Sequence, residues 1–188
     1  DFMEKPDSTQ PGRKGISVFV ICMNEEQNIR RCLESIKWCD EIVVIDSGSS
    51  DETVSICREY TTRIFERPWP GFVEQKKFGL EQCSQEWVLN IDADEEVSPE
   101  LRDQILGILS GDAYSPVEFN GYFLLRVVFY LNRWWRRGGW YPEYRLRFFR
   151  RKYSSWGGAD PHEKAVVNGR LSRLSGELRH YTYADVAQ

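Results

Sequence analysis

The chain has 188 residues, 41% of them hydrophobic and 29% charged, and a net charge of −4. This is the length and balance of one soluble globular domain that buries its core without disulfide staples. The five cysteines form no Cys-x-x-Cys pair, which argues against a zinc site or a disulfide framework and favours reduced thiols in a cytosolic protein. No apolar run approaches the length of a membrane span, and no signal-peptide pattern is present.

The first part of the chain alternates predicted strands and helices. Residues 1–14 are polar and are expected to form a flexible lead-in. A helix is expected after each strand, so the repeated units predict a mostly parallel α/β sheet with helices on both faces. Four apolar runs are typical of buried strands: ISVFVIC (Ile16–Cys22), EIVVID (Glu41–Asp46), RIFERP (63–68) and WVLNI (87–91).

The starts of the helices have signals of their own. Asn24 can cap the first helix, and Ser49 with Glu52 has the spacing of a capping box for the second. The third helix is expected over residues 72–83. Ser98-Pro99 opens the fourth, because proline suits the first helical position.

The second part differs in pattern and in charge. Residues 121–132, 144–151 and 163–174 are predicted to be strands, with a tight turn at Asn168-Gly169. Residues 121–180 carry a charge balance of +9, against −12 for residues 1–120, which favours an anionic partner for the second part. A new helix is predicted near the last residues, so we expect residues 184–188 to start a further, truncated segment.

Asp92 and Asp94 follow the fourth strand in the sequence WVLNIDADEE. Their side chains point to the same side, because side chains along a strand alternate with a period of two. Neighbouring carboxylates repel one another unless a cation lies between them, and a divalent ion that also binds substrate phosphates is a common solution. The alternative interpretation is that these acids cap the next helix and face water.

Polar segments also follow the first two strands, at Asn24-Glu25 and at Asp46-Ser47-Gly48. Ligands of an open parallel sheet bind beyond the carboxyl ends of its strands, so these segments and Asp92 are expected to converge. Asp46 can accept a hydrogen bond from a nucleobase, or it can simply form a turn with Ser47-Gly48. The chain has no GxGxxG and no GxxxxGK[ST] motif, which argues against a dehydrogenase and a P-loop enzyme.

Three motifs, SVFVICMNEEQNI, EIVVIDSGSSDET and WVLNIDADEE, resemble the family 2 glycosyltransferases of the GT-A fold. The branch of lipopolysaccharide-core β-glucosyltransferases is the most similar. Further similarity lies in GFVEQKKFGLEQC, WYPEYRLRFFRR, DPHEKAVV and HYTY. The resemblance implies one GT-A domain over residues 15–183, with a nucleotide-sugar part at 15–112 and a smaller mixed-strand acceptor part at 121–183.

The resemblance also implies which residues bind the donor. Asp46 would contact the uracil of a UDP-sugar, and Asn24 and Glu25 would line the nucleotide pocket. Lys76 lies on the helix that the family uses beside the nucleotide, and Asp92 would lie near the ribose or the donor sugar.

A metal and a base complete the implied site. Asp94, with Asp92, would hold Mg²⁺ or Mn²⁺ against the diphosphate, and His180 is either a further metal ligand or a packing residue. The family's base is often the last residue of a Glu-Asp pair, which is absent from the sequence Asp160-Pro161-His162-Glu163. We take Glu163 as the base and Asp160 as the alternative.

Arginines and aromatic residues alternate in NRWWRRGGWYPEYRLRFFRR, from residue 132 to residue 151. This composition is typical of an acceptor site, in which aromatic rings stack on sugars and arginines bind phosphates, and Trp140, Arg145 and Arg147 are the candidates. The alternative is a solvated basic face over an aromatic core. Nucleic acid is the weaker choice of partner, because no nucleic-acid-binding motif is present.

The resemblance therefore implies an inverting, metal-dependent and non-processive hexosyltransferase that uses a UDP-sugar. Its acceptor would be a saccharide or glycolipid of the cell envelope, such as a lipopolysaccharide core. We expect it in the cytoplasm, with peripheral contact to an anionic membrane at its inner face. The alternatives are a nucleotidyltransferase and a catalytically inactive nucleotide-sugar-binding module.

Overall fold

The computed structural model describes residues 12–111, 118–139, 141–160 and 162–182. Its largest feature is a nine-stranded sheet with the order β3-β2-β1-β4-β8-β6-β11-β5, in which β7 pairs with β6 beside this path. A separate two-stranded sheet joins β9 and β10. The first four strands are parallel, as predicted: β1 (Ile16–Cys22), β2 (Glu41–Asp46), β3 (Ile64–Glu66) and β4 (Trp87–Asp92).

Helices cover both faces of the parallel strands, so β1 is buried along its whole length. Ile16, Val18 and Val20 point to one face, which packs against α1 and α4. Phe19 and Ile21 point to the other, which packs against α3 and β9. The helices are α1 (Ile29–Ile36), α2 (Thr53–Cys57), α3 (Phe72–Gln82) and α4 (Pro99–Ser110).

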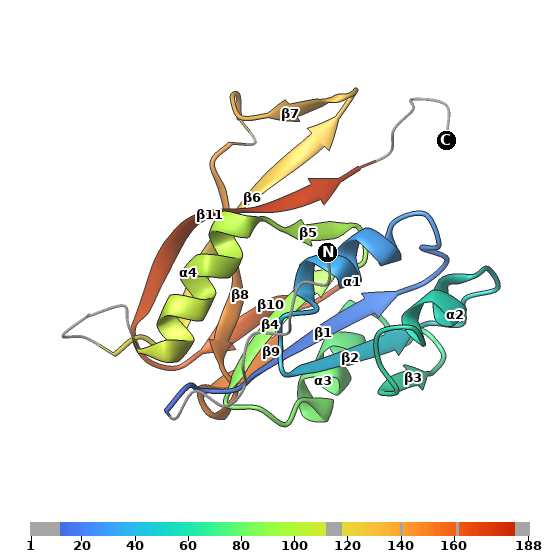
Figure 1. Ribbon diagram of the computed structural model, residues 1–188, viewed down its shortest axis with the longest axis horizontal. Helices are drawn as coiled ribbons and strands as arrows, with labels where there is room; N and C mark the ends of the chain where they lie inside the picture. The colour runs from blue at the N-terminus through green and yellow to red at the C-terminus, as the bar shows by residue number, and fades with distance from the viewer. Residues whose placement is uncertain (1–11, 112–117, 140, 161, 183–188) are drawn as a thin grey trace.

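The second half continues the same sheet with mixed directions. β8 pairs antiparallel with β4 and with β6, whereas β11 runs parallel to β6. Figure 1 shows β7 and the adjoining ends of β6 and β11 standing out from the rest of the sheet. The elements are β5 (Glu95–Val97), β6 (Gly121–Tyr130), β7 (Arg133–Trp135), β8 (Glu143–Arg150), a 3-10 turn (Arg151–Tyr153), β9 (Ser154–Gly157), β10 (Lys164–Val167) and β11 (Leu171–Tyr181).

Two of the predicted helix starts are wrong. The first helix begins at Ile29, and Asn24 is not its cap but adopts a φ of 54° and accepts a hydrogen bond from the Ser50 N–H. The second begins at Thr53, and Ser49 is not its cap because its hydroxyl donates to Asp46. Ser98 does cap α4, accepting from the Leu101 N–H at 3.2 Å.

The Asn168-Gly169 turn forms, with a φ of 112° at Gly169, but it does not join a hairpin. β10 before it pairs with β9, and β11 after it pairs with β6 and β5. The predicted lead-in lies mostly outside the described residues, and the segment 184–188 lies wholly outside them. All five cysteines are buried. Within the described ranges, no helix is both long and apolar enough to cross a membrane.

Candidate functional site

The carboxyl ends of β1, β2 and β4 lie side by side. In the sheet register Cys22 is opposite Asp46, and Ile21 is opposite Asp92. Asn24 connects the first two ends, because its N–H donates to the Ser49 hydroxyl at 2.9 Å and its side-chain oxygen accepts from the Ser50 N–H at 2.8 Å. The polar segments predicted to converge therefore do converge.

Asp46 is buried, and its carboxylate organises the loop that follows β2. It accepts hydrogen bonds from the N–H groups of Gly48 and Ser49, each at 2.9 Å. This is the turn-forming role that the sequence left open. It uses one carboxylate oxygen, while the other accepts from the Ser49 hydroxyl, so a contact with a nucleobase stays a prediction.

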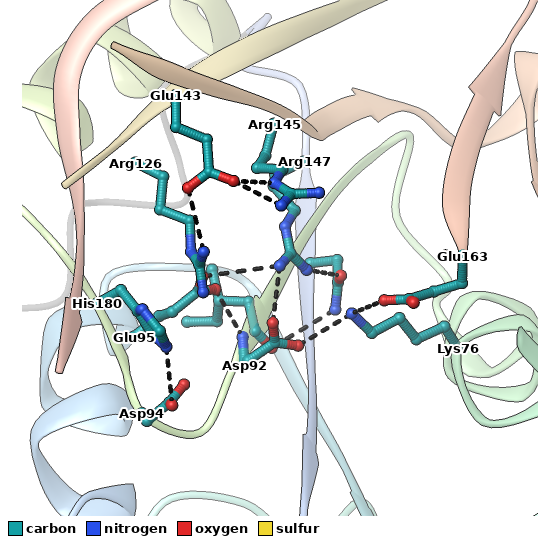
Figure 2. A network of polar contacts seen from close by, with 12 residues as sticks. Lys76, Asp92, Asp94, Glu95, Arg126, Glu143, Arg145, Arg147, Glu163 and His180 are labelled. Atoms are coloured by element: carbon teal, nitrogen blue, oxygen red, sulfur yellow. Dashed lines mark hydrogen bonds and ion pairs between the residues drawn. The ribbon is translucent and has the colours of Figure 1, made fainter. Parts of the chain in front are cut away.

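Asp92 lies between two buried cations (Figure 2). Its Oδ1 is 3.0 Å from Lys76 Nζ, and its Oδ2 is 2.7 Å from Arg147 Nη2. Lys76 is 2% exposed and Arg147 is 8% exposed. Burial opposes the ionisation of Asp92, but the charges of Arg147 and Lys76 outweigh burial and hold its pKa well below the usual range.

These three residues belong to a longer series of ion pairs in which the sign of the charge alternates (Figure 2). The series begins at the candidate base, in the loop before β10, and ends at a partly exposed arginine of β8; its other members come from four strands and one helix. Successive members are Glu163, Lys76, Asp92, Arg147, Glu95, Arg126, Glu143 and Arg145.

Glu95 and Arg126 are functional candidates that the sequence analysis missed. Glu95 is fully buried, accepts from the Asp92 N–H at 2.9 Å and pairs with Arg126 at 2.9 Å. Burial alone would lower the pKa of Arg126, but Glu95 and Glu143 hold it above its ordinary value. The signal was present, because a charge within the apolar run GYFLLRVVFY needs a buried partner.

Asp94 faces His180, which β11 brings beside it (Figure 2). His180 Nε2 is 3.0 Å from Asp94 Oδ2. Ligands at neighbouring corners of an octahedral Mg²⁺ site, each about 2.1 Å from the ion, are about 3.0 Å apart, so this pair fits two corners. Over the described ranges, no group of three His, Cys, Asp or Glu side chains gathers that could hold a metal. The metal role predicted for Asp92 stays a prediction, since its carboxylate is engaged by cations.

Glu25 lies near this pair. It accepts a hydrogen bond from the Asn28 side chain at 2.9 Å. Burial raises the pKa of Glu25, the bond from Asn28 opposes this, and the charge of Asp94 adds to the increase. Glu25 therefore lies close enough to Asp94 for their charges to interact, and its role in lining the nucleotide pocket stays a prediction.

The two candidate bases have different surroundings. Glu163 is mostly buried, and its Oε1 is 3.1 Å from Lys76 Nζ. Asp160 is exposed, and its Oδ1 accepts from the Val73 N–H at 2.9 Å, in the first turn of α3. Gly71 fits closely here, because a Cβ on it would lie 2.0 Å from Asp160 Oδ2. Asp160 thus attaches its loop to the start of α3.

The predicted acceptor residues also differ in exposure. The Arg145 side chain is 53% exposed and pairs with Glu143. Arg147 is interior and donates to Asn90 and Asp92, so an acceptor contact from it would first require these bonds to change. Trp140 lies outside the described residues. The acceptor role of all three stays a prediction.

Comparison with known proteins places the chain among glycosyltransferases. The family described as "Glycosyl transferase family 2" matches residues 17–161. An uncharacterized glycosyltransferase of Rickettsia typhi is 32% identical over 185 residues, covering 93% of this chain and 63% of its own length. The lipopolysaccharide core biosynthesis glycosyltransferase LpsC of Rhizobium meliloti is 44% identical over 100 residues, covering 50% of this chain and 37% of its own. The chain therefore spans less than two thirds of the length of these relatives.

Among solved structures, TarS of S. aureus has the same arrangement. Its complex with UDP gives a TM-score of 0.62 at 17% identity, covering 89% of this chain and 60% of that one. Its complex with UDP-GlcNAc gives 0.60 at 18% identity, covering 90% and 59%. At this identity the likeness concerns the fold, and it confirms the predicted α/β GT-A architecture.

Proposed function

Because the chain belongs to glycosyltransferase family 2, we propose that it moves a hexose from a UDP-sugar to a hydroxyl of a saccharide or glycolipid acceptor. One observation carries this proposal: the β2 and β4 ends bring Asp46, Asp92 and Asp94 to one edge, where Lys76 also holds Glu163. The acceptor class follows LpsC, whose name gives lipopolysaccharide core biosynthesis. The donor class follows TarS, whose complexes contain UDP and UDP-GlcNAc.

The donor would lie across the three strand ends. Asp46 would accept from the uracil N–H, because its carboxylate is already held in place by Gly48 and Ser49. Asn24 and Glu25 would line the nucleotide side of the pocket. Asp92 would face the ribose or the donor sugar, held by its two cations.

A divalent cation is part of the proposal. Asp94 and His180 would hold it, and the diphosphate and water would supply the other ligands, as is usual for Mg²⁺. When bound, the ion would neutralise negative charge that develops on the departing UDP. The second nitrogen of His180, Nδ1, is buried and has no hydrogen-bond partner within the described residues.

Glu163 is the proposed base. A sugar hydroxyl is a poor nucleophile and must lose its proton as it attacks. Glu163 would accept that proton, and attack from the face opposite UDP would invert the anomeric centre. Asp160 is the weaker candidate, because its carboxylate is engaged by the backbone of α3.

The acceptor would approach from the second half of the sheet. β6 and β7 form a hairpin whose turn residues Leu131 and Asn132 have φ of 51° and 57°, and Leu131 is 46% exposed. A leucine is uncommon at positive φ, and Trp134 and Trp135 of β7 are of a residue type that is enriched at the headgroup layer of a membrane. We therefore include peripheral contact with anionic lipid, and a cytoplasmic location at that surface, in the proposal.

A donor screen tests this function. UDP-sugars and GDP-sugars are incubated with Mn²⁺, and release of the nucleotide is measured; we expect release from a UDP-sugar that stops when EDTA is added. UDP with Mn²⁺ should also raise the melting temperature more than GDP or ADP, because it binds the folded state more tightly.

Three other outcomes would contradict the proposal. Release of pyrophosphate from a nucleoside triphosphate would indicate a nucleotidyltransferase. Stabilisation by UDP without release from any sugar donor would indicate an inactive binding module. Equal stabilisation by UDP, GDP and ADP would rule out a specific contact between Asp46 and uracil.

A further inference from the structure

Lys76 is a buried lysine with two acidic partners. Its side chain is 2% exposed, which is rare for lysine unless it is paired. Two contacts of its ammonium are with Asp92 at 3.0 Å and Glu163 at 3.1 Å, and the group lies 5.5 Å from the centre of the Trp156 ring. One cation thus connects the end of β4 with the candidate base.

Glu163 needs such a connection because its loop is not part of the main sheet. It precedes β10, which pairs only with β9 within the described residues. The loop is instead attached to α3, by Asp160 at the Val73 N–H and by Glu163 at Lys76. α3 in turn packs on β1, β2 and β9. Side-chain contacts to one helix therefore set where the Glu163 carboxylate lies relative to the strand ends.

We infer that Lys76 is a positioning residue, which holds the Glu163 carboxylate in register with Asp92 at the donor site. This inference rests on the proposed function and gives Lys76 a different use from direct contact with the nucleotide. Arg147 holds Asp92 from the other side, at 2.7 Å. Loss of Lys76 would therefore leave Asp92 paired and release mainly Glu163.

The expected effect of that release follows from geometry. A glutamate side chain has several rotatable bonds, and without its ion pair the carboxylate would sample many positions. Displacement of a reacting group by about 1 Å can cost roughly a hundredfold in rate. The cost should appear in kcat, because the donor contacts of Asp46 and Asp94 are unchanged.

Three variants separate this role from a general loss of charge. Lys76→Met keeps the buried stem and removes the ammonium, and Lys76→Arg keeps the charge. Lys77→Met is the matched control, since Lys77 is the next residue of α3 and is 44% exposed in a pair with Glu74. With the best donor from the screen, we expect Lys76→Met to lower kcat about a hundredfold while KM for the donor changes less than about threefold. Lys76→Arg should recover part of kcat, and Lys77→Met should match the wild type.

A double variant then identifies the residue through which Lys76 acts. If Lys76 acts by positioning the Glu163 carboxylate, Lys76→Met should cause no further loss of turnover in a protein that already carries Glu163→Gln. The double variant should therefore turn over within about twofold of Glu163→Gln alone. The double variant also removes the charges of Lys76 and Glu163 together, so no buried carboxylate is left without its partner. If urea denaturation shows that Lys76→Met alone is unstable, the double variant can still be compared with Glu163→Gln.

Two results would overturn the inference. The first is a double variant lower than Glu163→Gln by the full factor that Lys76→Met loses alone, because Lys76 then acts on the donor. The second is a Lys76→Met loss confined to KM for the donor, which indicates contact with the diphosphate. Failure of the proposed function looks different, because the wild type itself would then release no UDP or Glu163→Gln would keep full turnover.

Discussion

Two parts of the large sheet, the parallel strands β1, β2 and β4 and the later strands β6 and β8, differ in where their charged residues lie. β1, β2 and β4 are mostly apolar, and Asp46 and Asp92 stand at the carboxyl ends of β2 and β4. β6 and β8 instead carry Arg126 and Arg147 within the strands, and both guanidinium groups reach inward to acids near the end of β4. β8 pairs directly with β4, which puts this second set of charges beside the first.

This difference teaches how the site is built. Clustered carboxylates would repel one another, and among the described residues of the first four strands and their helices, Lys76 is the cation that pairs with Asp92. Strands β6 and β8 of the second half supply two arginines, so the acids presented by one half are held in place by cations from the other. Buried ion pairs therefore join the two halves, and we expect changes at the contact between them to affect both stability and activity.

The largest effect is expected at Asp94, whose side chain pairs with His180 and not, among the described residues, with an arginine or lysine. Asp94→Ala should lower UDP-sugar turnover at least about a thousandfold, which corresponds to about 4 kcal/mol of activation free energy. A loss of this size is expected because a metal ion contributes several kcal/mol of charge stabilisation. The fold should be retained, since Asp94 pairs with His180 rather than with the buried series. Turnover is measured over a range of Mn²⁺ concentrations.

Asp103→Ala serves as the control, because that side chain is 65% exposed on α4. Near-normal turnover by Asp94→Ala at ordinary metal concentrations would rule out the metal-ligand role. A loss that high Mn²⁺ restores would instead show weakened affinity at a site that is otherwise intact.

The next effect concerns the series itself. Glu95→Ala should lower the free energy of unfolding by about 3 kcal/mol, the lower end for a broken buried pair, because Arg126 and Arg147 keep Glu143 and Asp92 as partners. Urea denaturation followed by circular dichroism measures this change. Glu59→Ala removes an exposed pair with Arg30 and should leave the midpoint unchanged. Equal midpoints for the two variants would show that the buried series does not stabilise the fold.

Much of the parallel side could be predicted from the sequence. β1, β2 and β4 are continuous apolar runs ending in polar residues, and such runs specify buried strands with a site at the end. The starts of the helices could not be predicted as well. Asn24 and Ser49 have the chemistry of caps, but each bonds across to the other loop instead.

The second half was harder to predict because the pairings that join it to the rest of the sheet, β11 with β6 and β8 with β4, are non-local. The Asn168-Gly169 turn was predicted, yet β11 after it runs parallel to β6, which lies some fifty residues earlier in the chain. Arg147 was predicted to bind the acceptor because the sequence around it combines arginines with aromatic residues. Arg147 is buried with Asn90 and Asp92 as its hydrogen-bond partners, and the pairing of β8 with β4 brings these residues together. No local sequence pattern predicts that pairing.

The third prediction separates the two carboxylates that the sequence could not separate. Glu163→Gln should lower turnover roughly a hundredfold, as is typical for the loss of a general base, with little change in UDP affinity. Asp160→Asn keeps an acceptor for the Val73 N–H and should retain most of the turnover. Steady-state kinetics and calorimetric UDP titration measure the two quantities. The reverse pattern would make Asp160 the base and Glu163 a partner of Lys76 only.

The smallest effect is expected at the outer edge of the second half, where the β6–β7 hairpin stands out from the sheet (Figure 1). Arg133, Arg136 and Arg137 lie on or just after β7, and Arg136 is already paired with Glu177 at 2.7 Å. Arginine near an anionic surface contributes about 1 kcal/mol, so the two others should together contribute about 2 kcal/mol, or roughly thirtyfold in vesicle affinity.

Flotation with anionic and neutral vesicles measures this contribution. We expect the wild type to bind anionic vesicles, to bind less as salt rises because exposed charges are screened, and to bind neutral vesicles poorly. Changing the three arginines of the hairpin together to Ser should weaken flotation. Changing Arg30, Arg58 and Lys77 removes the same charge from exposed positions on the helices α1 and α3 and beside α2, and should not. Equal loss in both triple variants would mean that net charge alone drives binding, and no flotation by the wild type would leave the hairpin as an acceptor-side or solvated surface.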